Sequence, residues 1–178
     1  EVPVPTQAQL EPVFQEVLDS EIEPYEDTTP EEPLFDSTPV PGSVVEERSI
    51  PELNITEWTL SNDVHLVLKP TDFKDDEVLV QAFSPGGYSL SSLENHISAS
   101  TAAQVVALGG VDDFSVVNLQ RKLAGKAVGV APSIGELTEG FSGRASPQDL
   151  ETMFQLIHLY FTAPRVDSTA FQAWKRQM

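Results

Sequence analysis

The sequence predicts an α+β fold, in which a mostly antiparallel sheet carries helices on one face in the order βββααββαα. Short runs with alternating apolar and polar residues, separated by turn residues, indicate strands, whereas longer runs with apolar spacings of three and four indicate helices. The expected strands come in groups and the expected helices come in pairs. This grouping is typical of α+β layers rather than of alternating βαβ units.

Residues 1–53 differ from the rest of the chain in charge and in proline content. They hold 14 Asp and Glu against one basic residue, Arg48, which gives a net charge of −13, and 9 of the 14 prolines. Residues 54–178 hold 14 acidic and 9 basic residues, a net charge of −5, so the two parts sum to −18. We therefore expect an acidic, proline-rich linker over 1–53 and a single domain over 54–178.

One short helix is expected within the linker, near residues 7–20, because apolar residues recur there at helical spacing even though Pro12 falls inside the run. The stretch after residue 22 is interpreted as an extended segment that need not fold. The alternative is a strap that Tyr25, Leu34 and Phe35 anchor on a neighbouring domain.

Three strands and a helix are expected next. Residues 55–60 and 64–69 alternate across a three-residue turn, which predicts a hairpin, and residues 77–84 predict a third strand that ends at the PGG sequence. An Ala-rich helix is expected over 97–108, after a capping box at Ser91 and Glu94 and before two glycines.

Further helices and a second hairpin are expected in the rest of the domain. A helix is expected from Ser115 to Leu123, and residues 126–134 and 137–145 predict a second hairpin. The SPQD sequence at 146–149 has a cap, a first-turn proline and an acid in order, so it predicts a helix start. We expect that helix to bury Leu150, Met153, Phe154, Ile157, Tyr160 and Phe161, and a last helix to begin at Asp167 or Ser168.

Charge and composition exclude several partners. A net charge of −18 argues against nucleic acid and against an anionic membrane surface, because both would repel the chain. No apolar run approaches the roughly 20 residues that span a bilayer, so no membrane insertion is expected. The chain has no cysteine, which removes thiolate chemistry and cysteine-based zinc sites. The three histidines, His65, His96 and His158, are far apart in sequence and are interpreted as ordinary surface or partly buried residues.

The series of the hairpin at 55–69, the strand ending in PGG, the helix ending in GG and the SPQDLE helix start resembles the opening of a domain from the insulinase/pitrilysin family of zinc metallopeptidases. In catalytic domains of that family, the helix after the third strand carries the inverted motif H-x-x-E-H. The resemblance places Ser100, Ala103 and Gln104 where the two histidines and the glutamate would stand. Zinc requires imidazole, thiolate or carboxylate ligands, so we expect no metal ligand and no catalytic residue at these positions.

The resemblance therefore implies a non-catalytic domain at the start of the C-terminal half of a bacterial zinc protease, and the first of the two repeats of such a domain. Its partners would be the catalytic half of the same polypeptide, which would hold the zinc, and a peptide substrate in the chamber between the halves. A periplasmic or cell-envelope location would follow. The alternative is a structural scaffold or protein-binding subunit of the same fold, without a peptidase half. Because the chain begins at Glu1 and stops inside an amphipathic stretch, we expect it to be a piece of a longer protein.

Overall fold

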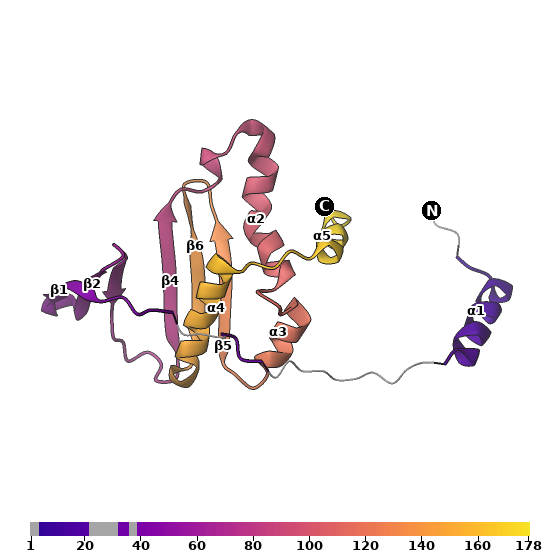
Figure 1. Cartoon of the computed structure of the whole chain (residues 1–178), viewed down its shortest axis with the longest axis horizontal. Coiled ribbons are helices and arrows are strands. Elements are labelled where there is room, and N and C mark those ends of the chain that lie inside the picture. The colour runs from indigo at the N-terminus through magenta and orange to yellow at the C-terminus, as the bar shows by residue number, and fades with distance from the viewer. Residues whose placement is uncertain (1–3, 22–31, 36–38) are drawn as a thin grey trace.

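A computed structural model of the chain describes residues 4–21, 32–35 and 39–178. The predicted fold class is confirmed, since two antiparallel sheets are combined with helices (Figure 1). The helices are α1 (Gln7–Asp19), α2 (His96–Gly109), α3 (Val116–Lys122), α4 (Leu150–Thr162) and α5 (Ser168–Lys175). The strands are β1 (Val44–Ile50), β2 (Ile55–Leu60), β3 (His65–Leu68), β4 (Val78–Pro85), β5 (Val128–Ile134) and β6 (Thr138–Ala145).

The first sheet has the order β1-β2-β3, and all its neighbours are antiparallel. The predicted hairpin is present as β2 and β3, with Thr56 opposite Leu68 and Thr59 opposite His65. Strand β1 is a correction, because its residues were expected in the linker. Its sequence, VVEERSI, has no alternation of apolar residues, and nearly every side chain in it is exposed. Backbone pairing with β2 therefore defines this strand, and the hydrophobic pattern gave no sign of it.

The second sheet has the order β4-β6-β5, so β6 is central and antiparallel to both neighbours. Helix α4 packs on β5 and β6, and α2 packs on β5 (Figure 1). The close approach of α4 depends on Gly143 in the middle of β6. A Cβ atom there would lie 2.8 Å from Sδ of Met153, which is closer than such atoms come in folded proteins.

Side-chain caps start two of the predicted helices as expected. Ser115 accepts a hydrogen bond from the backbone N–H of Asn118 at 3.2 Å, and Ser146 accepts one from Asp149 at 3.2 Å. The capping box predicted at Ser91 and Glu94 is wrong. Ser91 follows a short 3₁₀ turn, Tyr88–Leu90, and Glu94 lies inside a second one, Leu93–Asn95, which precedes α2. The Ser91 hydroxyl instead donates to the carbonyl of Tyr88.

The buried core lies between α3, α4 and the turn that follows α2. Its largest cluster of buried side chains consists of Leu34, Val111, Phe114, Leu119, Leu156 and Leu159. The predicted inner face of α4 is partly wrong, because Thr152, Leu156 and Leu159 are buried while Phe154 and Phe161 are exposed. The helix carries apolar residues of its own on all sides, so their spacing alone could not select the face that meets the sheet.

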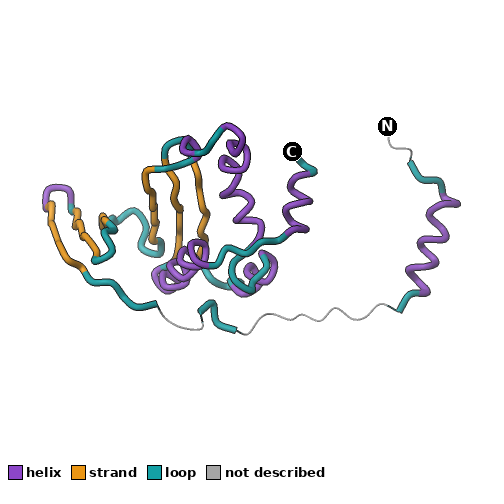
Figure 2. The backbone as a smooth tube through the Cα atoms, turned by 45° about the horizontal axis from the view of Figure 1, so that its top comes forward, coloured by secondary structure: helices purple, strands orange, loops and turns teal. Residues whose placement is uncertain are grey.

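Ahead of β1, the linker residues Leu34 and Phe35 also contact the core of the domain. Leu34 is only 7% exposed within the core cluster, and Phe35 packs against that cluster. The interpretation of an extended, uninvolved segment is therefore wrong for these two residues, and Tyr25 lies outside the described residues. The short helix expected in the linker is present as α1, which lies apart from both sheets and buries none of its residues (Figure 2). The division into a linker over 1–53 and a domain over 54–178 stays a prediction.

Candidate functional site

The helix expected to carry a lost zinc motif is α2. Ser100, Ala103 and Gln104 share one side of it, because residues three and four apart lie together on a helix. Ser100 and Ala103 are half-buried and Gln104 is exposed. The Ser100 hydroxyl donates to the carbonyl of Ile97 at 3.2 Å. These groups offer a hydroxyl, a methyl and a carboxamide, so zinc does not fit here. Their equivalence to the family's motif stays a prediction.

The three histidines lie on different elements and meet different neighbours. His65, on β3, is 3.3 Å from the hydroxyl of Thr59 through Nδ1. His96, at the start of α2, meets the ring of Tyr88 edge-on with centroids 5.2 Å apart, and His158 of α4 meets the ring of Phe35 at 5.1 Å. Across the described ranges, no three His, Cys, Asp or Glu side chains are grouped so that they could hold a metal ion.

The C-terminal end of α2 is fixed to the start of α5 by Arg165 and Asp167. Arg165 donates to the carbonyl of Gly109 at 3.0 Å and to the carboxylate of Asp167 at 2.8 Å. Asp167 also accepts hydrogen bonds from the backbone N–H groups of Thr169 and Ala170, so it caps α5. The bond from Ala170, and after it the Arg165 guanidinium, hold the pKa of Asp167 below its ordinary value of 3.8.

Gly109 makes this junction possible, because a Cβ atom there would collide with the carbonyl oxygen of Arg165. The two glycines were predicted only as a helix end, and Asp167 only as a helix start. The contacts of Arg165 were missed. Its bond to the carbonyl of Gly109 joins residues 56 positions apart and leaves no local pattern in the sequence around Arg165.

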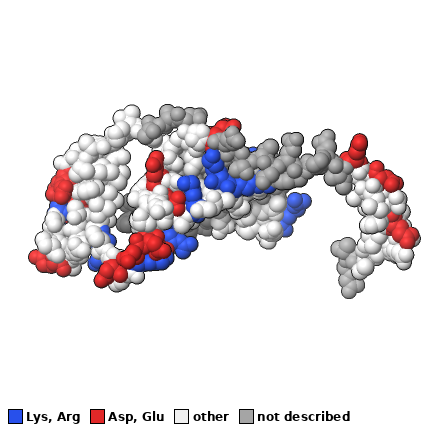
Figure 3. Space-filling model, turned by 90° about the horizontal axis from the view of Figure 1, so that it is seen from below, with Lys and Arg blue, Asp and Glu red and all other residues white. Residues whose placement is uncertain are grey.

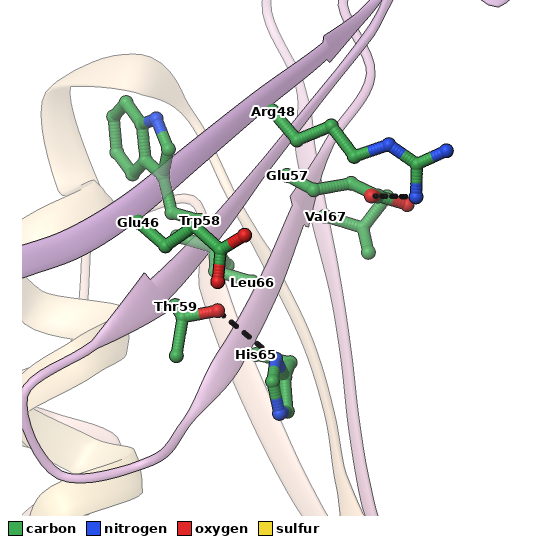
Figure 4. Close-up of a pocket in the computed structure, with 8 residues that line it drawn as sticks. All are labelled: Glu46, Arg48, Glu57, Trp58, Thr59, His65, Leu66 and Val67. Atoms are coloured by element: carbon green, nitrogen blue, oxygen red, sulfur yellow. Dashed lines mark hydrogen bonds and ion pairs between the residues drawn. The ribbon is translucent and has the colours of Figure 1, made fainter.

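A shallow hollow of about 360 Å³ lies on the first sheet (Figure 4). The strand register aligns two cross-strand rows on one face, Glu46 with Thr59 and His65, and Arg48 with Glu57 and Val67. Arg48 and Glu57 form an ion pair at 3.5 Å, which is exposed and contributes little stability. The hollow is lined by Glu46, Arg48, Glu57, Trp58, Thr59, His65, Leu66 and Val67. Sequence analysis missed it because β1 was not predicted.

Trp58 leaves that sheet on the opposite face, beside Glu47 and Leu66 in the register. Its indole Nε1 is buried and makes no hydrogen bond to any described residue. Burying such a donor without a partner costs free energy. The indole points away from the polar rows, so it adds no chemistry to the hollow.

A second hollow, of about 400 Å³, lies where β5 begins and β6 ends. It is lined by charges that pair with one another, with Lys74 3.5 Å from Glu77 and Arg144 3.7 Å from the same carboxylate. Hydrogen bonds from Ser146 and from the backbone of Ala127 lower the pKa of the nearby Asp149. Because these charges are matched within the chain, the hollow has no excess of one sign to attract a charged ligand.

The fold defines a class of protein. It is the fold of insulinase-type zinc proteases, as shown by solved structures that superpose on nearly the whole chain. The crystal structure of the periplasmic protease PqqL from Escherichia coli covers 97% of the chain with a TM-score of 0.76 and 19% identity. A mutant of the ferredoxin protease FusC, in complex with Arabidopsis ferredoxin, covers 99% with a TM-score of 0.75 and 19% identity. The chain covers 19% and 20% of those two proteins.

Curated sequences agree with this class. The chain is 30% identical to the Zinc protease PQQL-like of Arabidopsis thaliana over 141 residues, which is 79% of the chain. It is 24% identical to the Probable zinc protease PqqL of Haemophilus influenzae over 171 residues, which is 96% of the chain. No protein-family model matches. The chain spans only 12% and 18% of the lengths of these relatives, so it resembles one part of a zinc protease.

The comparisons confirm the resemblance that the sequence indicated, at the level of fold and of protease relatives. Within the described residues, no helix is long and apolar enough to cross a membrane.

Proposed function

We propose that the chain is a non-catalytic domain of a zinc metalloendopeptidase, which forms part of the wall of a substrate chamber. The observation that carries this proposal is that Ser100, Ala103 and Gln104 of α2 offer no zinc ligand, at positions that the family resemblance aligns with the inverted motif. A catalytic half of the same polypeptide would hold the zinc and cleave the peptide. The domain would position that half and contact the substrate.

Two findings support the proposal. The relatives are named zinc proteases, and the chain covers only 12% and 18% of them, which leaves ample length for a catalytic half. One structural neighbour is a periplasmic protease, and we propose the same compartment for this protein.

The surface best suited to meet a peptide is the uncovered face of the second sheet. On β4, Leu79 and Phe83 are 71% and 75% exposed, whereas Val78, Val80 and Ala82 face the helices. Opposite them on β6, the register places Arg144 beside Leu79 and the small Gly140 beside Phe83. Exposed apolar side chains next to a polar strand provide the mixed surface that unfolded peptides bind.

The first test asks whether the chain itself binds zinc and cleaves peptides. The purified chain is incubated with zinc and a mixed peptide pool, after which bound zinc is measured by mass spectrometry of the metal. We expect well under one zinc per chain and no cleavage. The triple variant Ser100→His, Ala103→Glu, Gln104→His is the control, since its two imidazoles one turn apart should bind zinc measurably. Zinc-dependent cleavage that persists through repurification of the parent chain would overturn the proposal.

The second test uses the full-length protein. Phe83→Ser should raise the KM for peptide substrates several-fold and leave zinc content unchanged, because it removes apolar contact area from the wall alone. Val67→Ser, an exposed change on the other sheet, is the matched control. An unchanged KM would remove this face from the proposal. A full-length protein without an intact inverted motif would favour the scaffold instead.

A further inference from the structure

One short segment of the linker is seated in the core. Leu34 is buried in the cluster that also holds Leu119 of α3 and Leu156 and Leu159 of α4. Phe35 packs against the same cluster and meets His158 with ring centroids 5.1 Å apart and the planes 74° from parallel. Glu32 and Pro33, immediately before them, are exposed. The contact is therefore made by two adjacent apolar side chains, and the preceding residues stay at the surface.

The seat for these side chains is built by the domain. Leu119 comes from α3 and Leu156 from α4, so the Leu34 side chain enters between two helices whose contacting leucines are 37 residues apart in sequence. Phe35 then lies against the half-buried imidazole of His158 at the rim. An edge-to-face ring contact of this kind prefers a defined orientation, which adds selectivity to the burial of Leu34.

The composition of the segment suits docking. Pro33 fixes its own φ and favours an extended conformation at Glu32, so less conformational entropy is lost when the segment binds. Acidic residues flank the pair in the sequence EEPLFD, and Arg121 and Lys122 follow Leu119 on α3. Figure 3 shows basic and acidic side chains side by side on the underside of the domain, and acidic side chains on α1.

We infer that the seat between α3 and α4 is a docking groove for an acidic, proline-preceded Leu-Phe segment, and that residues 32–35 occupy it as a releasable clip. The clip divides the linker into two parts. With Leu34 docked, α1 is tethered through residues 20–33, which reach at most about 50 Å when fully extended. With Leu34 released, the tether lengthens to residues 20–43, and its limit rises to about 80 Å. The groove therefore controls how far α1 can move from the domain. This inference does not depend on the proposed protease role.

The first experiment measures the clip directly. The chain has no native cysteine, so Glu32→Cys in the clip and Gln120→Cys on α3, both exposed positions, can carry spin labels for a pulsed distance measurement. We expect one narrow, short distance in the parent and in Leu34→Met, which conserves volume. Leu34→Asp should give a broad distribution with a longer mean. Val40→Asp, at a linker position that is 94% exposed, is the matched control and should resemble the parent.

The second experiment separates a docking groove from ordinary core packing. A synthetic peptide of residues 30–37, PEEPLFDS, should bind the Leu34→Asp chain and not the parent, whose groove is occupied. A Glu-specific protease should cut after Glu31, which is not followed by proline, at least about tenfold faster in Leu34→Asp than in the parent. If Leu34→Asp does not fold, as judged by circular dichroism, Phe35→Ala at the rim replaces it in both experiments. A folded release variant that keeps the narrow distance, or that does not bind the peptide, would overturn the inference.

Discussion

The two sheets each have three antiparallel strands but differ in how they are held. In the β4-β6-β5 sheet, the central strand contributes the buried Phe141, Gly143 and Ala145, and α4 covers that face. In the β1-β2-β3 sheet, no strand residue is buried, and no helix shares a substantial contact surface with it among the described elements. Helix cover therefore makes only one of the two sheets part of the hydrophobic core.

This difference indicates what each sheet contributes. A three-stranded sheet needs a packed face for independent stability, and the first sheet has only backbone pairing and half-buried side chains. Its mutations should therefore have small effects on the unfolding of this chain, and mutations in the second sheet should have large effects. The predictions below test this contrast, from the largest expected effect to the smallest.

The largest effect is expected for Met153→Ala on α4. Met153 is fully buried against β6, so its truncation removes apolar contacts and leaves a cavity. We expect the free energy of unfolding to fall by about 2–5 kcal/mol, measured by urea denaturation followed by circular dichroism.

Val67→Ala on β3 is the matched control in the first sheet. Val67 is exposed, and we expect a loss within about 0.5 kcal/mol. Equal losses for the two variants would show that the sheets are stabilised alike and would contradict the comparison.

The next effect concerns the packing of α4 on β6. Gly143→Val would drive its side chain into Met153, which costs about 1–3 kcal/mol through overpacking. Gly129→Val on β5 provides the control, since no atom lies within 4 Å of its Cβ position and valine favours strands. Both variants replace glycine with valine in the same sheet, so a lower melting temperature of Gly143→Val would report the packing against Met153. If Gly129→Val destabilises the chain as much as Gly143→Val, close packing is not the cause.

The sequence predicted the second sheet well because local patterns and packing agree there. Residues 77–84 alternate as a half-buried strand does, and Ser115 and Ser146 cap helices through bonds to residues three further on. These signals are local, so no tertiary knowledge was needed.

Prediction failed where a distant partner decides the structure. Strand β1 is defined by its pairing with β2, and the burial of Leu34 is defined by helices more than 80 residues away in sequence. The composition around both segments indicated a linker. The buried face of α4 was misassigned because its apolar residues surround the helix. At the candidate site, residue types alone predicted that Ser100, Ala103 and Gln104 offer no zinc ligand. The hydrogen bond from Arg165 to Gly109 could be found only in the folded structure.

A smaller effect is expected at the junction between α2 and α5. Since the pKa of Asp167 is lowered in the folded state, this carboxylate stabilises the fold above its unfolded pKa of about 3.9, and the contribution is lost as pH falls through the lower, folded pKa. Asp167→Asn keeps a capping side chain but loses the ion pair with Arg165. We expect its melting temperature to lie a few degrees below that of the parent at pH 6, and the difference to shrink below about pH 4.

Asp72→Asn, in an exposed loop, is the control for loss of one negative charge. A difference between parent and Asp167→Asn that stays constant from pH 6 to pH 3 would contradict a role for the charged carboxylate at this junction.

The smallest effect is expected for Trp58→Phe in the first sheet. The indole Nε1 is buried without a hydrogen-bond partner, and phenylalanine removes this donor while it keeps an aromatic ring on the strand. The lost contact area and the removed desolvation penalty oppose each other, so the net change in unfolding free energy should lie within about 1 kcal/mol. The chain has two tryptophans, so the variant leaves Trp174 as the only indole, and chemical denaturation is best followed by circular dichroism. A loss above about 2 kcal/mol would mean that Nε1 donates to a bound water or that this sheet is packed as tightly as the other. Tight packing around Trp58 would remove the distinction between the two sheets.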